Sequence, residues 1–149
     1  MNGPARTAAV LSLLAAPGAA QEVSPCDWRT QAAAIVEPWD KHTRTFGSGA
    51  VRLALMDVVE PAAGAFHLMI LSPPFDELGT RQCRALSFEG SMGFAGIDFP
   101  RLTASYDPAQ GLIWEVPVSI IDPASGGIAP RALRFVLNQA TGALRAEFF

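Results

Sequence analysis

Four side chains combine reactive chemistry with a suggestive place in the sequence: Asp57, His67, Asp76 and Glu77. A histidine within an apolar run can serve as a general base, and an aspartate beside such a run needs a hydrogen-bonding partner or a ligand. Asp76 and Glu77 are adjacent in the loop 72–80, and paired carboxylates can hydrolyse glycosides when a cleft sets their separation. These residues are therefore the candidates for a small hydrolase or lyase.

The same residues also have structural interpretations, which we favour over the catalytic ones. In an apolar strand, His67 is expected to be packed and hydrogen-bonded, and Asp57 to bond a loop backbone or to line a ligand cavity. Side chains alternate along a strand, which places Asp57 and His67 on opposite faces of one hairpin and argues against a direct acid–base pair. Asp76 and Glu77 fit a solvated loop with one helical turn. We therefore assign no catalytic residue.

The composition excludes several classes of protein. Two cysteines and two histidines in 149 residues are too few for a closed zinc site of the Cys/His kind, and we expect no metal or other cofactor. The net charge of −3 provides no basic surface for nucleic acid. With 50% hydrophobic residues, the chain has ample apolar content for a folded domain.

The first twenty residues have the pattern of a secretory signal peptide. Arg6 supplies the positive region, and residues 8–16 form an apolar segment too short to span a membrane. Small residues precede the expected cleavage between Ala20 and Gln21. We expect a single mature domain over residues 21–149, in the periplasm or outside the cell, without stable membrane insertion.

Cys26 and Cys83 are the only cysteines, and after export they would meet an oxidising compartment. A structural disulfide is the expected outcome, and closing a loop of that length stabilises a fold by about 4 kcal/mol. A reactive cysteine is the alternative, but the chain has no Cys-x-x-Cys motif to support it.

One turn pattern recurs four times and indicates a β fold. Three copies begin with Asp or Asn and one begins with Glu60, and each closes with a glycine that favours a tight four-residue loop. The segments between the turns predict an antiparallel meander of about eight strands, from about residue 43 to 149, forming a barrel or a sandwich. The four turns are 60–64, 107–111, 122–126 and 138–142.

The last hairpin can be paired residue by residue. A four-residue loop closing at Gly142 places Leu137 opposite Leu144 on an apolar face. On the other face, Arg134 lies opposite Glu147, and we expect an ion pair there. A slip of one residue would exchange the two faces, so this register is strongly specified.

Two places are expected to be irregular. In the first hairpin, a four-residue loop places Val58 opposite His67 and Asp57 opposite Leu68, and both faces of the pair are largely apolar, so both need a cover. Pro117 interrupts the strand 112–121, and a bulge or bend is expected there because proline cannot donate a backbone hydrogen bond.

An N-terminal helix is predicted as the cover of the second face. Ser24 and Pro25 are typical of a helix start, and Pro38 ends the pattern, which predicts a helix over about 25–37. Its apolar residues share one side, and the disulfide would hold that side against the sheet. These residues are Trp28, Ala32, Ile35, Val36 and Trp39.

The sequence favours a non-enzymatic binding module over an enzyme. Its partner would be a protein or a small apolar ligand held in a barrel mouth. The alternatives are a hydrolase or lyase using the four candidates above, and an inhibitor or stability partner of another exported protein. The preference for arginine over lysine, with abundant alanine, glycine and proline, is typical of a bacterium with a GC-rich genome.

Overall fold

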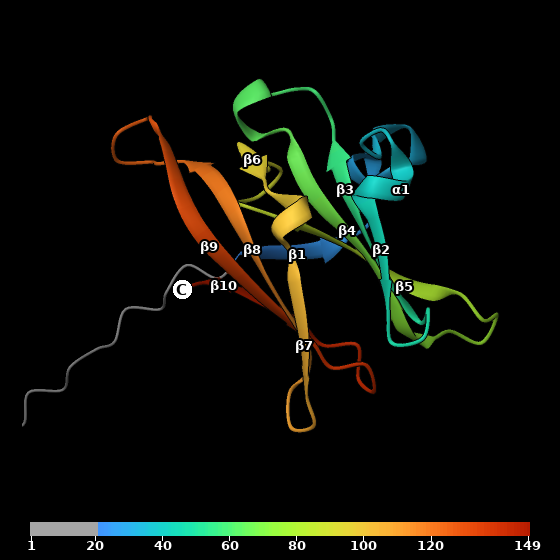
Figure 1. Ribbon diagram of the computed structural model, residues 1–149. Coiled ribbons are helices and arrows are strands. Elements are labelled where there is room, and N and C mark those ends of the chain that lie inside the picture. Colours follow the sequence, from blue (N-terminus) through green and yellow to red (C-terminus); the bar gives the residue numbers. More distant parts are fainter. Residues whose placement is uncertain (1–20) are drawn as a thin grey trace, which may run out of the picture.

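The computed structural model describes residues 21–149, which form two antiparallel sheets (Figure 1). Sheet 1 has the order β1-β5-β4-β3-β2. Sheet 2 has the order β10-β9-β8-β6, and β7 also pairs with β8. The strands are β1 (Glu22–Pro25), β2 (Thr43–Phe46), β3 (Val51–Asp57), β4 (Phe66–Phe75), β5 (Arg81–Ser87), β6 (Gly96–Ile97), β7 (Thr103–Asp107), β8 (Gly111–Ile121), β9 (Ile128–Leu137) and β10 (Leu144–Phe148).

The mainly β, antiparallel class is confirmed, although ten strands are described instead of about eight. The inner faces of the two sheets pack on each other, and neither sheet closes into a barrel among the described residues. One edge of each sheet meets the other where Gln21 N donates to the carbonyl oxygen of Ala146, 3.3 Å away. The largest fully buried side chains of the shared core include Trp114, Phe94, Phe99, Phe135, Leu53 and Ile70.

The three hairpin turns of sheet 2 form as predicted. Asp107, Asp122 and Asn138 each accept, through Oδ1, a hydrogen bond from the backbone N–H two residues on. The closing glycines have the positive φ that such a loop needs. The first residue and the glycine of each turn therefore do what their types predict.

The register of the last hairpin is confirmed, but its expected ion pair is not formed. Leu144 pairs with Leu137, and Glu147 pairs with Arg134. Within residues 21–149, the ion pairs are Arg29–Asp27 and Arg101–Asp98, so Arg134 and Glu147 lie opposite each other without a contact within 4.0 Å. Glu147 is exposed, and an ion pair with one partner in water gains little.

The predicted register of the first hairpin is wrong by two residues. His67 pairs with Met56 instead of Val58, and Asp57 pairs with Phe66. Glu60 N donates to the carbonyl oxygen of Val58 at 2.8 Å, which closes a γ-turn and lengthens the loop. A shift of two keeps every side chain on its face, so Asp57 and His67 lie on opposite faces, as predicted.

Pro117 does not produce the expected bulge in the ladder between β8 and β9. Their register runs without interruption through Pro117, which pairs with Ala132. On the opposite side, the Pro117 carbonyl oxygen accepts from Asp98 N at 2.9 Å, and β8 changes its neighbour there from β7 to β6. The missing N–H therefore falls at a gap between two strands and interrupts no ladder.

The helix predicted over residues 25–37 is wrong. Ser24 and Pro25 belong to β1, because they pair with β5. Trp28 and Trp39, which were expected on the buried side of a helix, remain 53% and 47% exposed. The helical elements are single turns: η1 (Trp28–Thr30), η2 (Ala32–Ala34), α1 (Trp39–His42), η3 (Ala62–Gly64) and η4 (Phe99–Arg101).

The same segment nevertheless covers the outer face of sheet 1. Residues 26–42, which we call the N-terminal cover, lie against β3 (Figure 1). Its first part lies on that face, where Arg29 donates to Ser87 Oγ at 3.0 Å. Its later part joins the edge of β3 beyond the end of β2, because Val36 N donates to the carbonyl oxygen of Leu55 at 3.0 Å and Ile35 forms a β-bridge with Met56. The predicted location is therefore correct for the first part of the cover and wrong for Ile35 and Val36, and the predicted helix is not formed.

The signal peptide predicted for residues 1–20 lies outside the described residues, as does the Ala20 side of the expected cleavage site. Gln21, on the other side of that bond, is buried at the edge of sheet 1.

Candidate functional site

A disulfide joins Cys26 to Cys83, as predicted. Cys26 begins the N-terminal cover and Cys83 lies in β5, so the bond fixes the cover to the strand next to the β1 edge of sheet 1. Beside it, Cys26 N donates to the carbonyl oxygen of Cys83 at 3.2 Å. A disulfide of this kind is typical of proteins in an oxidising compartment.

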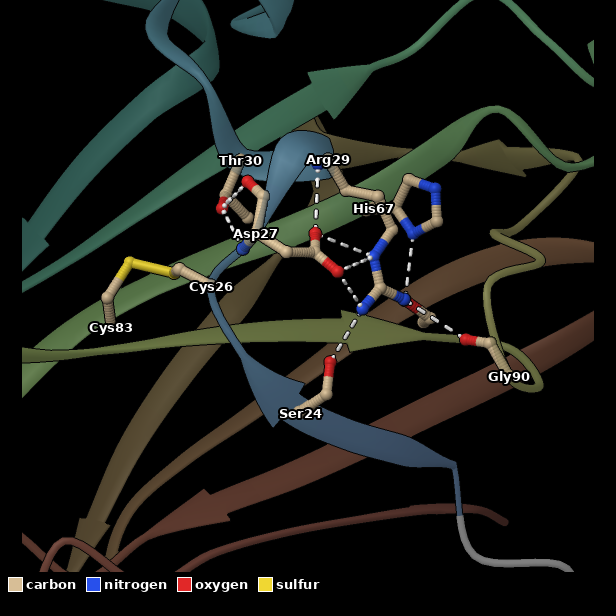
Figure 2. Close-up of polar contacts among 9 residues, drawn as sticks. Ser24, Cys26, Asp27, Arg29, Thr30, His67, Cys83 and Gly90 are labelled. Carbon is tan, nitrogen blue, oxygen red and sulfur yellow. Dashed lines mark hydrogen bonds and ion pairs between the residues drawn. A yellow bond between two sulfur atoms is a disulfide. The ribbon is translucent and has the colours of Figure 1, made fainter.

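A second attachment of the cover is a polar network around Arg29 (Figure 2). The Arg29 side chain is only 5% exposed, and its guanidinium donates to Asp27 Oδ2 at 2.8 Å, Ser24 Oγ at 2.8 Å and Ser87 Oγ at 3.0 Å. It also donates to the Gly90 carbonyl oxygen at 3.1 Å. Hydrogen bonds from Arg29 lower the pKa of Asp27 below its ordinary value.

His67 extends this network into the outer face of sheet 1. Its Nδ1 lies 2.8 Å from Ser87 Oγ. Because that oxygen already accepts from Arg29, the hydroxyl proton is free to be donated to Nδ1, which leaves the imidazole proton on Nε2. Burial lowers the pKa of His67 to about 4, and the charge of Arg29 acts in the same direction.

The Ser87–His67 pair has the hydrogen bond of a nucleophile and its base, but it is closed to substrate. Both side chains are 0% exposed. Gly93 packs against the ring so closely that a Cβ there would lie 2.9 Å from His67 Cε1. A nucleophile and its base must both reach the substrate. The network is therefore a structural link between the cover and β5.

Asp57 both bonds a loop backbone and lines a pocket, the two roles considered from the sequence. Its Oδ1 accepts from Val59 N at 2.8 Å. Val59 has φ of 70°, which a β-branched residue adopts only under strain, and it is the central residue of the γ-turn that follows Asp57. The carboxylate thus stabilises an unfavourable turn.

A shallow pocket of about 250 Å³ lies between that turn and the N-terminal cover. Two exposed apolar side chains border it: Trp28, which is 53% exposed, and Val59, which is 69% exposed. One carboxylate and no basic side chain are present in the lining. The lining residues are Trp28, Gln31, Ala33, Ala34, Asp57, Val58 and Val59, and we call this site the Trp28–Val59 pocket.

Asp76 and Glu77 lie at the opposite end of the β3–β4 hairpin. Asp76 Oδ1 accepts from Leu78 N at 2.9 Å and from Thr80 N at 2.7 Å, which makes it the organiser of an exposed turn without the helical turn expected there. Because β4 spans ten residues, Asp57 and Asp76 are separated by about 30 Å. The four candidate residues therefore do not converge on one site.

Sequence reasoning missed Arg29, Ser87, Trp28 and Val59 as site residues. A helix over the cover would place Arg29 toward solvent and Trp28 toward the core. In the structure Arg29 is buried and Trp28 is exposed. The sequence offered one signal against the helix: Asp27 and Arg29 carry opposite charges two residues apart. Side chains at that spacing can bond each other only outside a regular helix.

Comparisons with models of protein families, with curated proteins and with solved structures found no match. Within residues 21–149, no helix is long and apolar enough to cross a membrane. In the same part of the chain, no three His, Cys, Asp or Glu side chains gather as a metal site would need. The chemistry of the two sites described above is therefore the basis for a functional proposal.

Proposed function

We propose that this protein is a non-enzymatic binding module that holds a partner protein at the Trp28–Val59 pocket. The observation that carries this proposal is Val59: a strained, β-branched residue presented to solvent at 69% exposure. Folding alone gains nothing from exposing an apolar side chain on an unfavourable turn, and such strain tends to be kept where recognition uses it. Trp28 on the facing side of the pocket has the residue type most enriched at binding hot spots.

The size of the pocket favours a protein partner over a small apolar ligand. Its volume of about 250 Å³ falls below the range of small-molecule sites, and it can take one protruding side chain. The space between the sheets, where a ligand would sit in a barrel, is filled by core side chains such as Trp114 and Phe135, both 0% exposed. An inhibitor or stability partner of another exported protein would bind in the same way.

The proposed location is the bacterial periplasm or the medium. The disulfide supports an oxidising compartment, and the signal peptide expected from residues 1–20 supplies the route.

The function is tested by selecting ligands from a random peptide library displayed on phage, with the disulfide-bonded protein immobilised. We expect selected peptides to lose about tenfold in affinity for the Trp28→Ala variant, since hot-spot tryptophans have effects of this size. Trp39→Ala is the matched control, because Trp39 is 47% exposed and does not line the pocket. Selection of no peptide, or of peptides that bind Trp28→Ala unchanged, would contradict the proposal.

A further inference from the structure

We infer that the occupant of the Trp28–Val59 pocket is a cationic side chain, lysine or arginine, of the partner protein, with Asp57 as its counter-charge. This inference rests on the proposed function and names the chemistry that the pocket recognises. The contacts of Asp57, the apolar lining and the charges around the pocket each support it.

The Asp57 carboxylate is held in place with one oxygen to spare. Oδ1 is fixed by the Val59 N–H at 2.8 Å, whereas Oδ2 has no hydrogen-bond partner among residues 21–149. No ion pair within the same residues involves Asp57. A carboxylate oriented by its own backbone and free on its second oxygen is suited to accept from an ammonium or guanidinium group.

The remaining lining suits the aliphatic stem of such a side chain. Ala33, Ala34 and Val58 provide apolar contacts, and Trp28 adds an indole ring. Lysine and arginine bury their methylene stems against apolar surface and keep the charged end near a polar group. An indole beside a carboxylate also attracts a cation through its ring electrons.

The charges around the pocket favour a cationic occupant over an anionic one. The lining carries one carboxylate and no basic side chain, and Glu60 follows directly in the same loop. The nearest guanidinium in the sequence, Arg29, is turned into the polar network and compensated by Asp27 at 2.8 Å. An acidic partner would therefore meet repulsion here, whereas a basic one would be attracted.

The inference is tested by titrating the protein with two capped tripeptides, acetyl-Ala-Lys-Ala-amide and acetyl-Ala-norleucine-Ala-amide. Norleucine has a similar apolar stem without the charge. Binding is followed through the indole N–H resonance of Trp28, assigned from the spectrum of Trp28→Ala. We expect the lysine peptide to bind about fivefold more tightly at low salt, and the difference to shrink at high salt.

Asp57→Asn is the decisive variant, because an amide oxygen can keep the hydrogen bond to Val59 N while the charge is lost. This variant is expected to bind the lysine peptide only as tightly as it binds the norleucine peptide. Asp76→Asn is the matched control, since Asp76 organises a turn in the same way about 30 Å away and should change neither affinity.

The outcomes separate this inference from the proposed function. Equal binding of the two peptides, or a lysine preference that survives in Asp57→Asn, overturns the cationic occupant and leaves the binding module standing. A Trp28 signal that neither peptide shifts also overturns the cationic occupant, and the peptide selection then decides the proposed function separately.

Discussion

The hairpins of sheet 2 and the N-terminal cover are held by different kinds of contact. In the hairpins, Asp107, Asp122 and Asn138 each hold a turn through their nearest neighbours in sequence. In the cover, the conformation depends on distant residues: Cys26 is bonded to Cys83 of β5. Local sequence patterns describe the first region well because its structure is locally determined, and they misjudge the second because contacts across the fold override them.

The difference has a functional side. The hairpin turns use residues that suit their backbone, whereas the turn at Val59 uses one that does not. Conflicts between local preference and the final fold are expected where a protein gives up stability for function. The Trp28–Val59 pocket, our candidate binding site, lies at this conflict and not among the regular hairpins.

Removal of the disulfide should have the largest effect, because it tests how far the cover depends on distant contacts. The double variant Cys26→Ser/Cys83→Ser is expected to lose about 4 kcal/mol in free energy of unfolding, since the bond spans 57 residues. Urea titration of the oxidised protein and of the variant measures the difference. An unchanged midpoint would show that the cover holds without its covalent attachment.

Loss of the Arg29 guanidinium tests the second attachment. Arg29→Met is expected to cost about 3 kcal/mol, because Asp27, Ser87 and a backbone carbonyl would lose their shared donor. Arg131→Met is the matched control, since within residues 21–149 the exposed Arg131 side chain donates only to the carbonyl of its neighbour, Pro130. Similar losses in the two variants would refute the structural role of the network.

The pH dependence of stability should reveal the contribution of His67, a member of the same network, in the unmodified protein. Folding lowers the pKa of His67 from 6.5 to about 4, so its contribution is complete above pH 6.5 and is lost as the pH falls toward 4. Between pH 7 and pH 5 we expect a loss of about 2 kcal/mol, measured by urea titration at each pH. His67→Gln should flatten this slope. A slope that persists in the variant would assign the effect to other groups.

Removal of the side-chain acceptor from a hairpin turn should lower the stability of the protein. Asn138→Ala removes the oxygen that accepts from Ala140 N at 3.0 Å, and we expect a loss of about 1 kcal/mol. The melting temperature measures it. No change would mean that the turn is held by its strands, which would weaken the contrast between the two regions.

The strained turn should respond in the opposite direction. Val59→Asn is expected to raise the free energy of unfolding by up to about 1 kcal/mol, because asparagine tolerates a positive φ better than a β-branched residue does. The same variant should weaken the peptides selected on the protein. A variant that is both less stable and equally able to bind would remove the argument for strain kept for recognition.

Most of the sheet structure could be predicted because its signals are periodic or local. Alternation in the last hairpin set the pairing of Leu137 with Leu144, and the glycines that close the Asp and Asn turns marked where the next strands begin. The location of the first part of the cover also followed from the sequence, since two apolar faces in the first hairpin required something on the second.

The candidate site could be predicted only in part. The sequence singled out Asp57, whose carboxylate does bond the loop backbone, but the pocket also requires Trp28, which a helical period assigned to the core. Nothing local marks Val59, because a γ-turn on a valine contradicts its propensity and is maintained by the Asp57 carboxylate. Ser87 becomes a partner of Arg29 only through the pairing of β1 with β5.

Two attachments of the cover involve β5 but respond to different agents. Thiol reductants act on the bond to Cys83, and protons act on the network at Ser87 and His67. Opening of the cover as a unit requires both of these attachments to break, together with the backbone contacts of Ile35 and Val36 with β3, so reduction of the disulfide alone leaves the other contacts in place. Amide exchange at Val36, which donates to Leu55 of sheet 1, would report that opening directly.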